Sequence, residues 1–215
     1  MPLVLYKLTN RPIIGLLTVS RSPSFFSYTN VKEYFSFVFL HELTHVLGFL
    51  QGMFPYYPPE VGDILTYKVI RGVNRTLIST PKVVDRAKKY FNCNTLEGLE
   101  LEDQGGDGST ISHWEQRILL GEYMGAVIYQ EEMAISEFTL ALLEDSTWYK
   151  VNYYTGGLFR FGKNKGCAFI ENDCLDQNLK SNFKNEFFDG DNPWYGSCST
   201  GRQSRIMKLL IIITI

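Results

Sequence analysis

The longest apolar stretch in the first half of the chain predicts a buried helix. From Val31 to about Gly48 apolar residues fall on nearly every helical face, with Asn30 as the N-cap and Gly48 as the stop. A helix that is apolar all round belongs in a protein core. We therefore expect this helix to be buried rather than to lie at the surface.

Two shorter apolar runs predict strands. Arg11–Ser20 and Ile64–Ile70 are rich in large apolar and β-branched residues, which is typical of strands. Between them, Gln51–Pro59 contains three prolines. Because proline interrupts a helix, this segment predicts a loop. After Cys167 the chain is polar and shows no clear period.

Two further helices follow from their start signals. Thr80 followed by Pro81 opens a helix to about Phe91, because proline is favoured at the first helical position. Ser136 caps a second helix that ends near Trp148. Helices and separate short strands together predict an α+β fold.

Composition narrows the function classes. The chain has 215 residues, is 45% hydrophobic and 20% charged, and carries a net charge of −2. That length can bury one core or two small lobes around a cleft. Phosphate binding needs a basic face, so the charge argues against nucleic acid as the main partner. The apolar tail Ile206–Ile215 has about half the ~20 residues needed to cross a bilayer.

Three histidines form a candidate metal site. His41-Glu42-Leu43-Thr44-His45 lies in the predicted buried helix, and histidines at i and i+4 share one helical face. A catalytic zinc takes three protein ligands and a water, and His113 is the remaining histidine. The alternative is a pair of hydrogen-bonded helix histidines beside a surface glutamate.

The chemistry of this set is that of a zinc-activated water. Zinc would lower the pKa of the water and polarise a peptide carbonyl, and Glu42 would act as general base. A structural zinc site with a cysteine as fourth ligand is a weaker alternative. The four cysteines allow three pairings, which their positions alone do not decide: Cys93, Cys167, Cys174 and Cys198.

The motif resembles one branch of the metzincin peptidases. His41 to Gly48 matches the front half of the metzincin signature, but Gln51 stands where the third histidine usually is. His113 follows only after a long insertion, and this chain is similar to the leishmanolysin family in that respect. The resemblance is carried in order by Arg11–Gly15, Leu40–Phe49, Tyr90–Cys93, Leu101–Gly106, Ser112–Glu115, Glu122–Met124, Leu142–Asp145, Trp148–Tyr149 and Asn164–Cys167.

The resemblance implies a zinc metalloendopeptidase with a metzincin-like α+β fold, mostly helical with a small partial sheet around the active-site helix. It implies one Zn²⁺ held by His41, His45 and His113, with Glu42 as base. It also assigns Met124 to the Met-turn, whereas without it Met124 is ordinary core filling.

The same resemblance implies a disulfide and a location. Cys93 is expected to bond Cys167, which indicates an oxidising compartment and hence the extracellular space or the cell surface, with membrane association as an option. The implied partners are extended polypeptides, bound antiparallel to the strand around Arg11–Ser20. Oligomeric state cannot be read from the sequence.

Three parts are expected by this analogy. Residues 1–51 are the remnant of an N-terminal catalytic lobe with the active-site helix, and 52–175 form a central lobe with the third ligand and the Met-turn. Residues 176–215 are a truncated, irregular C-terminal remnant. The signal peptide, the pro-segment and most of the first lobe of the family are missing, so we expect a partial gene product. A catalytically silent module acting in cell adhesion is the alternative function.

One local departure from the family concerns the end of the last predicted helix. Where the family usually has Thr-Gly, this chain has Ser146-Thr147. Glycine suits the left-handed residue that ends a helix, so we expect its loss to cost about 1 kcal/mol.

Overall fold

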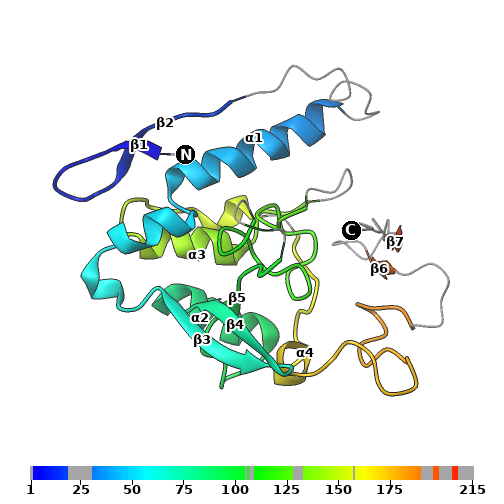
Figure 1. The fold of residues 1–215 in the computed structure, drawn as a ribbon. Coiled ribbons are helices and arrows are strands. Elements are labelled where there is room, and N and C mark those ends of the chain that lie inside the picture. The colour runs from blue at the N-terminus through cyan, green and yellow to red at the C-terminus, as the bar shows by residue number, and fades with distance from the viewer. Residues whose placement is uncertain are drawn as a thin grey trace.

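The computed structural model describes residues 2–18, 31–104, 106, 109–127, 133–156, 158–189, 196–198 and 205–207. The helices are α1 (Val31–Leu47), α2 (Pro81–Phe91), α3 (Glu137–Asp145) and α4 (Cys167–Glu171). The strands are β1 (Pro2–Leu5), β2 (Pro12–Gly15), β3 (Leu65–Ile70), β4 (Val73–Ile78), β5 (Leu99–Glu100), β6 (Gly196–Cys198) and β7 (Arg205–Met207). Figure 1 shows α1 and the β1–β2 hairpin on one side of α3, and the β3–β4 hairpin with α2 on the other. Helices with small separate antiparallel sheets make this an α+β protein.

Helix α1 has the expected extent, but it is less buried than expected. Its buried face carries His41, Thr44 and His45, whereas Phe39 is 56% exposed. The reason is that the core covers one side of the helix, whereas the short β1–β2 hairpin covers only part of another side, at Val46. The predicted cap Asn30 lies outside the described residues.

The first predicted strand is shorter than expected and has a partner. Strand β2 covers Pro12–Gly15 and pairs antiparallel with β1, which no sequence pattern predicted. A Cβ on Gly15 would lie 2.2 Å from a methyl carbon of Val46, so glycine at this position allows β2 to approach α1. Val19 and Ser20 of the predicted strand lie outside the described residues.

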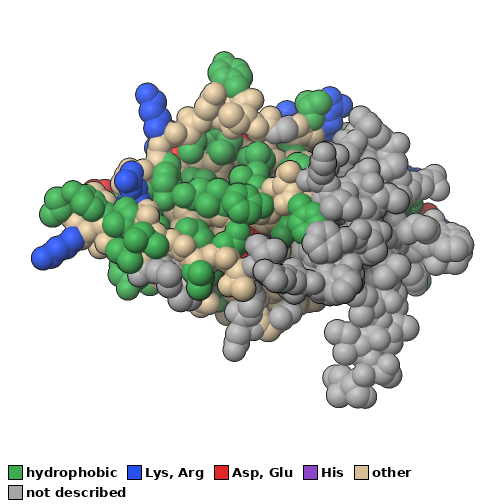
Figure 2. All heavy atoms as spheres, turned by 90° about the horizontal axis from the view of Figure 1, so that it is seen from above, with side chains coloured by type: hydrophobic (Ala, Val, Ile, Leu, Met, Phe, Trp, Pro, Cys, Tyr) green, Lys and Arg blue, Asp and Glu red, His purple; other side chains and the backbone are tan. Residues whose placement is uncertain are grey.

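Apolar side chains are exposed where this hairpin meets α1. Seen from above, they gather over β1, β2 and α1 (Figure 2). They are Val4, Tyr6, Leu8, Ile13, Ile14, Leu16, Phe39 and Leu43. This surface lies within residues 1–51, which the family resemblance assigns to the remnant of the first lobe.

The second sheet is a hairpin extended by one short strand. Strand β3 lies where the sequence predicted it. Strand β4, which was not predicted, pairs antiparallel with β3, so that Leu65 lies opposite Ile78 and Ile70 lies opposite Val73. Arg71 and Gly72 both have positive φ, 51° and 74°, which is the backbone of a two-residue type I′ turn. Strand β5 adds to β4 and leads the chain toward His113.

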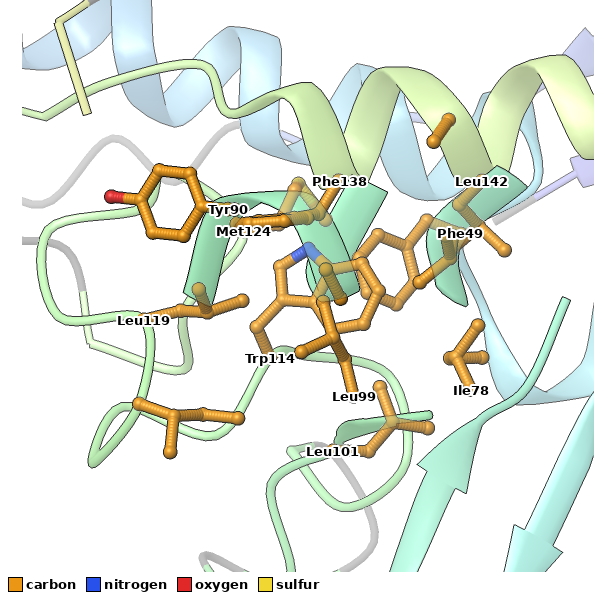
Figure 3. Close-up of a cluster of buried hydrophobic side chains, with 14 of the residues drawn as sticks. Phe49, Ile78, Tyr90, Leu99, Leu101, Trp114, Leu119, Met124, Phe138 and Leu142 are labelled. Carbon is orange, nitrogen blue, oxygen red and sulfur yellow. The ribbon is translucent and has the colours of Figure 1, made fainter. Parts of the chain in front are cut away.

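The core lies between these sheets and helices α2 and α3. Trp114 sits at its centre, surrounded by Phe49, Leu99, Leu101 and Phe138 (Figure 3). Trp114 and Phe138 are fully buried. Large aromatic side chains supply much of the buried area, which is the main source of stability in such a core.

Three local expectations have clear outcomes. The predicted Cys93–Cys167 disulfide is present and joins the end of α2 to the start of α4, with the two Cα atoms 4.8 Å apart. Helix α3 ends at Asp145, before the expected Trp148, because Thr147 turns the chain with a φ of 61°. The prediction that Gln51–Pro59 is a loop without helix is wrong, because Gln51–Tyr56 is a 3₁₀ helix and another covers Pro59–Val61. Short 3₁₀ segments need few N–H donors, so they tolerate proline.

One stretch of the described residues, Phe35–Tyr56, is long and apolar enough to cross a membrane. It contains most of α1, and core helices of soluble proteins have the same length and composition.

Candidate metal centre

Three histidine rings converge at the buried face of α1. His41 and His45 lie one turn apart on that helix, and His113 comes from the segment after the glycine-rich loop. Their Nε2 atoms are separated by 3.1 Å (His41–His45), 3.1 Å (His41–His113) and 3.2 Å (His45–His113). All three residues are buried. The structure thus brings together the three predicted ligands.

The opposite nitrogen of each ring contacts a backbone carbonyl. His41 Nδ1 lies 2.7 Å from the Tyr123 oxygen, His45 Nδ1 2.7 Å from the Phe49 oxygen, and His113 Nδ1 2.8 Å from the Ser109 oxygen. A carbonyl can only accept a hydrogen bond, so each Nδ1 carries the hydrogen. Every neutral ring therefore has a bare lone pair on Nε2.

Three converging lone pairs cannot hydrogen-bond to one another. Each of the short Nε2–Nε2 contacts lacks a proton to share, so the arrangement is repulsive unless a cation lies between the rings. Zinc–imidazole bonds of about 2.0–2.1 Å in a tetrahedral site place nitrogens roughly 3.3 Å apart. The observed separations are close to this value. The three nitrogens therefore fit a zinc ion.

The electrostatics of the site keep the rings neutral. Burial lowers the pKa of His41 and His113. Burial, and to a smaller extent the two neighbouring histidines, together lower the pKa of His45 to about 3. Neutral imidazole is the form that binds metal. At neutral pH the three rings are therefore already in the protonation state that a cation requires.

Gly48 places the carbonyl that orients His45. It has a φ of 137°, a backbone conformation that favours glycine, and a Cβ there would lie 2.9 Å from the Trp148 ring. The chain leaves α1 at this point and brings the Phe49 carbonyl back to His45 Nδ1. The glycine of the motif therefore ends the helix and positions a ligand.

His113 is held by backbone pairing on both of its sides. The Glu102 N–H donates to the His113 carbonyl at 2.9 Å, and the Ile111 N–H donates to the Glu102 carbonyl at 3.0 Å. The next residue, Trp114, donates from its N–H to the Met124 carbonyl at 3.0 Å. The third histidine is thus anchored between the extension of β5 and the segment around Met124.

Met124 lies in a tight turn beside the histidines. The Gly125 N–H donates to the Glu122 carbonyl at 3.0 Å and closes a four-residue turn from Glu122 to Gly125. Met124 is fully buried in the core (Figure 3). The turn contacts the site through the Tyr123 carbonyl, which accepts from His41.

Glu42 occupies the accessible side of α1. Its side chain is exposed, and it follows His41 directly in the helix. An exposed carboxylate beside a buried ligand can contact water and a bound substrate at once. Its role as base remains a prediction.

Sequence reasoning missed two residues of the turn next to the histidines, Tyr123 and Glu122. The Tyr123 hydroxyl lies 3.0 Å from Thr44 Oγ1, which links the turn to α1 between the two helix histidines. Glu122 is buried beneath the turn, with a relative exposure of 2%. A single carboxylate in the apolar run Ile118–Ala126 was the signal that could have identified it.

A second group of possible ligands has its own counterion. The carboxylates of Glu102, Asp103 and Glu115 lie within 4.8 Å of one another. Arg75 pairs with Asp103 and approaches Glu115 to 3.9 Å. We interpret this group as an ion-pair network, because the guanidinium already supplies positive charge.

Known proteins resemble this chain over most of its length. The leishmanolysin family model matches residues 5–206. A leishmanolysin-like peptidase of Drosophila melanogaster is 34% identical over 171 residues, which is 63% of this chain and 25% of that protein. The corresponding peptidase of Caenorhabditis elegans is 32% identical over 203 residues, 77% of this chain and 30% of its own length. A leishmanolysin homolog of Crithidia fasciculata is 29% identical over 195 residues, 90% of this chain and 28% of its length.

These matches cover only part of each relative. The chain spans about a quarter to a third of the length of the curated relatives it matches. The family model, by contrast, covers nearly all of this chain. This chain is a member of the leishmanolysin family of metallopeptidases.

Proposed function

We propose that this chain carries the catalytic centre of a zinc-dependent metalloendopeptidase. The observation that carries the proposal is the set of three Nε2 lone pairs, 3.1–3.2 Å apart, whose tautomers are fixed by backbone carbonyls. Family membership supports the same activity. The metzincin-like arrangement of helix, third ligand and Met-turn is part of this proposal.

His41, His45 and His113 would hold one Zn²⁺, and Glu42 would be the general base. A bound zinc would lower the pKa of a water and act as a Lewis acid that polarises the peptide carbonyl. Glu42 would accept a proton from the attacking water and deliver it to the leaving amine. Its exposed carboxylate suits this role, because it can reach water and substrate without being a ligand.

The proposed substrate is an extended polypeptide lying antiparallel to β2. Within the described residues β2 pairs with β1 on one edge, which leaves its other edge free to accept a strand. The Cys93–Cys167 disulfide supports an extracellular or cell-surface location, since disulfides persist in oxidising compartments. Association with a membrane belongs to the same proposal.

The test compares zinc content and cleavage of an unfolded protein in wild type and Glu42→Ala. We expect chelator-sensitive cleavage in the wild type and a loss of ~10²-fold or more in Glu42→Ala with zinc retained. Glu60→Ala, which removes an exposed glutamate outside α1, is the matched control and keeps full activity. Cleavage that survives in Glu42→Ala contradicts the role of Glu42.

A catalytically silent module acting in cell adhesion is the second candidate. Such a module would keep the three metal ligands without using Glu42 as a base. Stable, zinc-loaded protein without turnover on a peptide library supports it. Chelator-sensitive turnover excludes it.

A structural zinc site with a cysteine ligand has less support. The disulfide uses Cys93 and Cys167, and the histidine group contains no cysteine among the residues whose side chains the structure describes. Zinc X-ray absorption showing sulfur as a direct ligand would favour this alternative. Nitrogen and oxygen alone would exclude it.

A further inference from the structure

One peptide unit connects His41 to a buried carboxylate. The carbonyl of the Tyr123–Met124 peptide accepts the hydrogen bond from His41 Nδ1 at 2.7 Å. The N–H of the same peptide donates to Glu122 Oε2 at 2.5 Å. Carboxylate, peptide and imidazole therefore form one continuous chain of hydrogen bonds that ends at the Nε2 lone pair of His41.

The surroundings of Glu122 are those of an ionised carboxylate. Its Oε1 accepts from the Ser136 N–H at 3.2 Å, from the Ser136 hydroxyl at 2.8 Å and from the Thr139 hydroxyl at 2.6 Å. The Thr139 oxygen itself accepts from Trp114 Nε1 at 2.8 Å, which leaves the Thr139 proton for Glu122. Four donors thus face the Glu122 carboxylate, which has almost no contact with solvent. These hydrogen bonds replace the water that a negative charge would otherwise need.

Burial opposes that charge. It raises the pKa of Glu122 to about 7, against the hydrogen bonds from Thr139, Met124 and Ser136, which lower it. Burying a carboxyl group costs free energy, and an apolar side chain of similar size would stabilise the same place in the core better. The placement of Glu122 therefore calls for a role other than packing.

We propose that Glu122 is a positioning residue of the metal centre, which polarises the Tyr123–Met124 peptide and thereby sets the orientation and basicity of His41. The inference rests on the proposed function. A charged acceptor on the peptide N–H makes the carbonyl a stronger acceptor, because hydrogen bonds in a chain polarise one another. Outer partners of ligating histidines act in this way on metal affinity.

A purely structural role makes a different prediction. If Glu122 only braces the turn against the start of α3, its loss loosens the site as a whole. If it acts through the peptide, its loss affects His41 alone. His45 and His113 are internal references, because their Nδ1 hydrogens bond to carbonyls of other peptides, those of Phe49 and Ser109.

The experiment follows the three Nδ1 hydrogens by NMR in the zinc-loaded protein at about pH 8, where Glu122 is ionised. In Glu122→Gln the acceptor for the Met124 N–H is neutral or absent, whichever way the amide points. We expect the His41 Nδ1 hydrogen to move upfield while those of His45 and His113 stay, and the zinc dissociation constant to rise about tenfold. Equal shifts at all three histidines, or none, overturn the inference.

Two further variants complete the test. Asp145→Asn makes the same carboxylate-to-amide change at a buried carboxylate at the other end of α3, where it accepts from the N–H groups of Lys82 and Val83. We expect it to leave His41 and the zinc affinity unchanged. A response of His41 to Asp145→Asn equal to that in Glu122→Gln overturns the inference.

Ser136→Ala decides the question if Glu122→Gln does not fold. It removes one donor from Oε1 and leaves the Met124 N–H bond intact, so the carboxylate concentrates its charge on that bond. We expect the His41 Nδ1 hydrogen to move downfield, opposite to its shift in Glu122→Gln. No shift, or an upfield one, contradicts the role of Glu122. Failure of the wild type to bind zinc would instead contradict the proposed function.

Discussion

Among single residues, the tautomers of the three histidines give a cluster of rings the lone pairs that a metal ion needs. The spacing of His41 and His45 predicted that they share a helical face, and composition left His113 as the third candidate. The carbonyls that fix the rings could not be predicted, because they belong to residues whose side chains play no part in the contact. Backbone partners of this kind leave no pattern in a sequence.

Thr147 tests the residue-level account of the end of α3. It is an exposed, β-branched residue with a φ of 61°, a conformation that costs such residues roughly 1–2 kcal/mol. Thr147→Gly removes this strain at some cost in chain entropy. We expect the free energy of unfolding to rise by about 1 kcal/mol. Urea denaturation measures it, and an unchanged or lower stability contradicts the strain.

The raised pKa of Glu122 makes a prediction about stability and pH. Because its pKa is about 7 in the folded chain and about 4.5 in the unfolded chain, ionisation favours unfolding. Well below pH 4.5 the carboxyl is protonated in both states and its ionisation costs the fold nothing, but this cost grows as the pH rises from 4.5 toward 7. The stability of the wild type relative to Glu122→Gln should therefore fall by about 2 kcal/mol from pH 5 to pH 7.

Urea unfolding of both proteins at each pH measures this difference, and titrations shared by the two proteins cancel. A stability difference that is constant between pH 5 and pH 7 would show that Glu122 does not titrate in this range.

Among the secondary-structure elements, helices with capping or proline signals were predicted, as were strands β2 and β3, but the partner strands β1 and β4 were not. Helix α2 begins at Pro81 as its start signal indicated. Strand β4 was missed because its turn uses Arg71 with a φ of 51°, where a hairpin signal would have asparagine or aspartate. The burial of α1 was overestimated, because an apolar helix does not reveal which of its faces has a neighbour.

The disulfide connects elements that surround the third ligand. Cys93 and Cys167 are separated by 74 residues, a segment that contains His113 and the turn with Met124. Closing a loop of this length restricts the unfolded chain by about 4 kcal/mol in the entropic model. Replacing both cysteines with alanine should lower the free energy of unfolding by about 2–4 kcal/mol.

Urea denaturation in the presence and absence of a reductant measures this effect. The double variant should be insensitive to the reductant, which controls for effects on Cys174. A wild type equally stable with and without the reductant contradicts a structural disulfide.

At the scale of the whole molecule, the meeting of His113 with α1 depends on the path of the chain between them. That path runs through the β3–β4 hairpin, α2 and β5. The count of histidines and the resemblance to a family suggested where the path ends, but not its course. Local patterns could not predict it, because the contacts that hold His113 join residues far apart in the sequence. The exposed apolar face over β1, β2 and α1 was hidden from sequence reasoning for the same reason.

Zinc binding by the wild type and His113→Ala tests the central claim most directly. The chain has three histidines, so this variant leaves the two helix histidines as the only imidazoles. We predict one zinc per chain in the wild type and an affinity at least ~100-fold lower in His113→Ala. Loss of a residue that only hydrogen-bonds to a ligand lowers metal affinity by about 10–100-fold, and loss of a ligand should cost at least as much. Equal affinity in the two proteins, measured by chelator competition, would contradict a centre built from all three histidines.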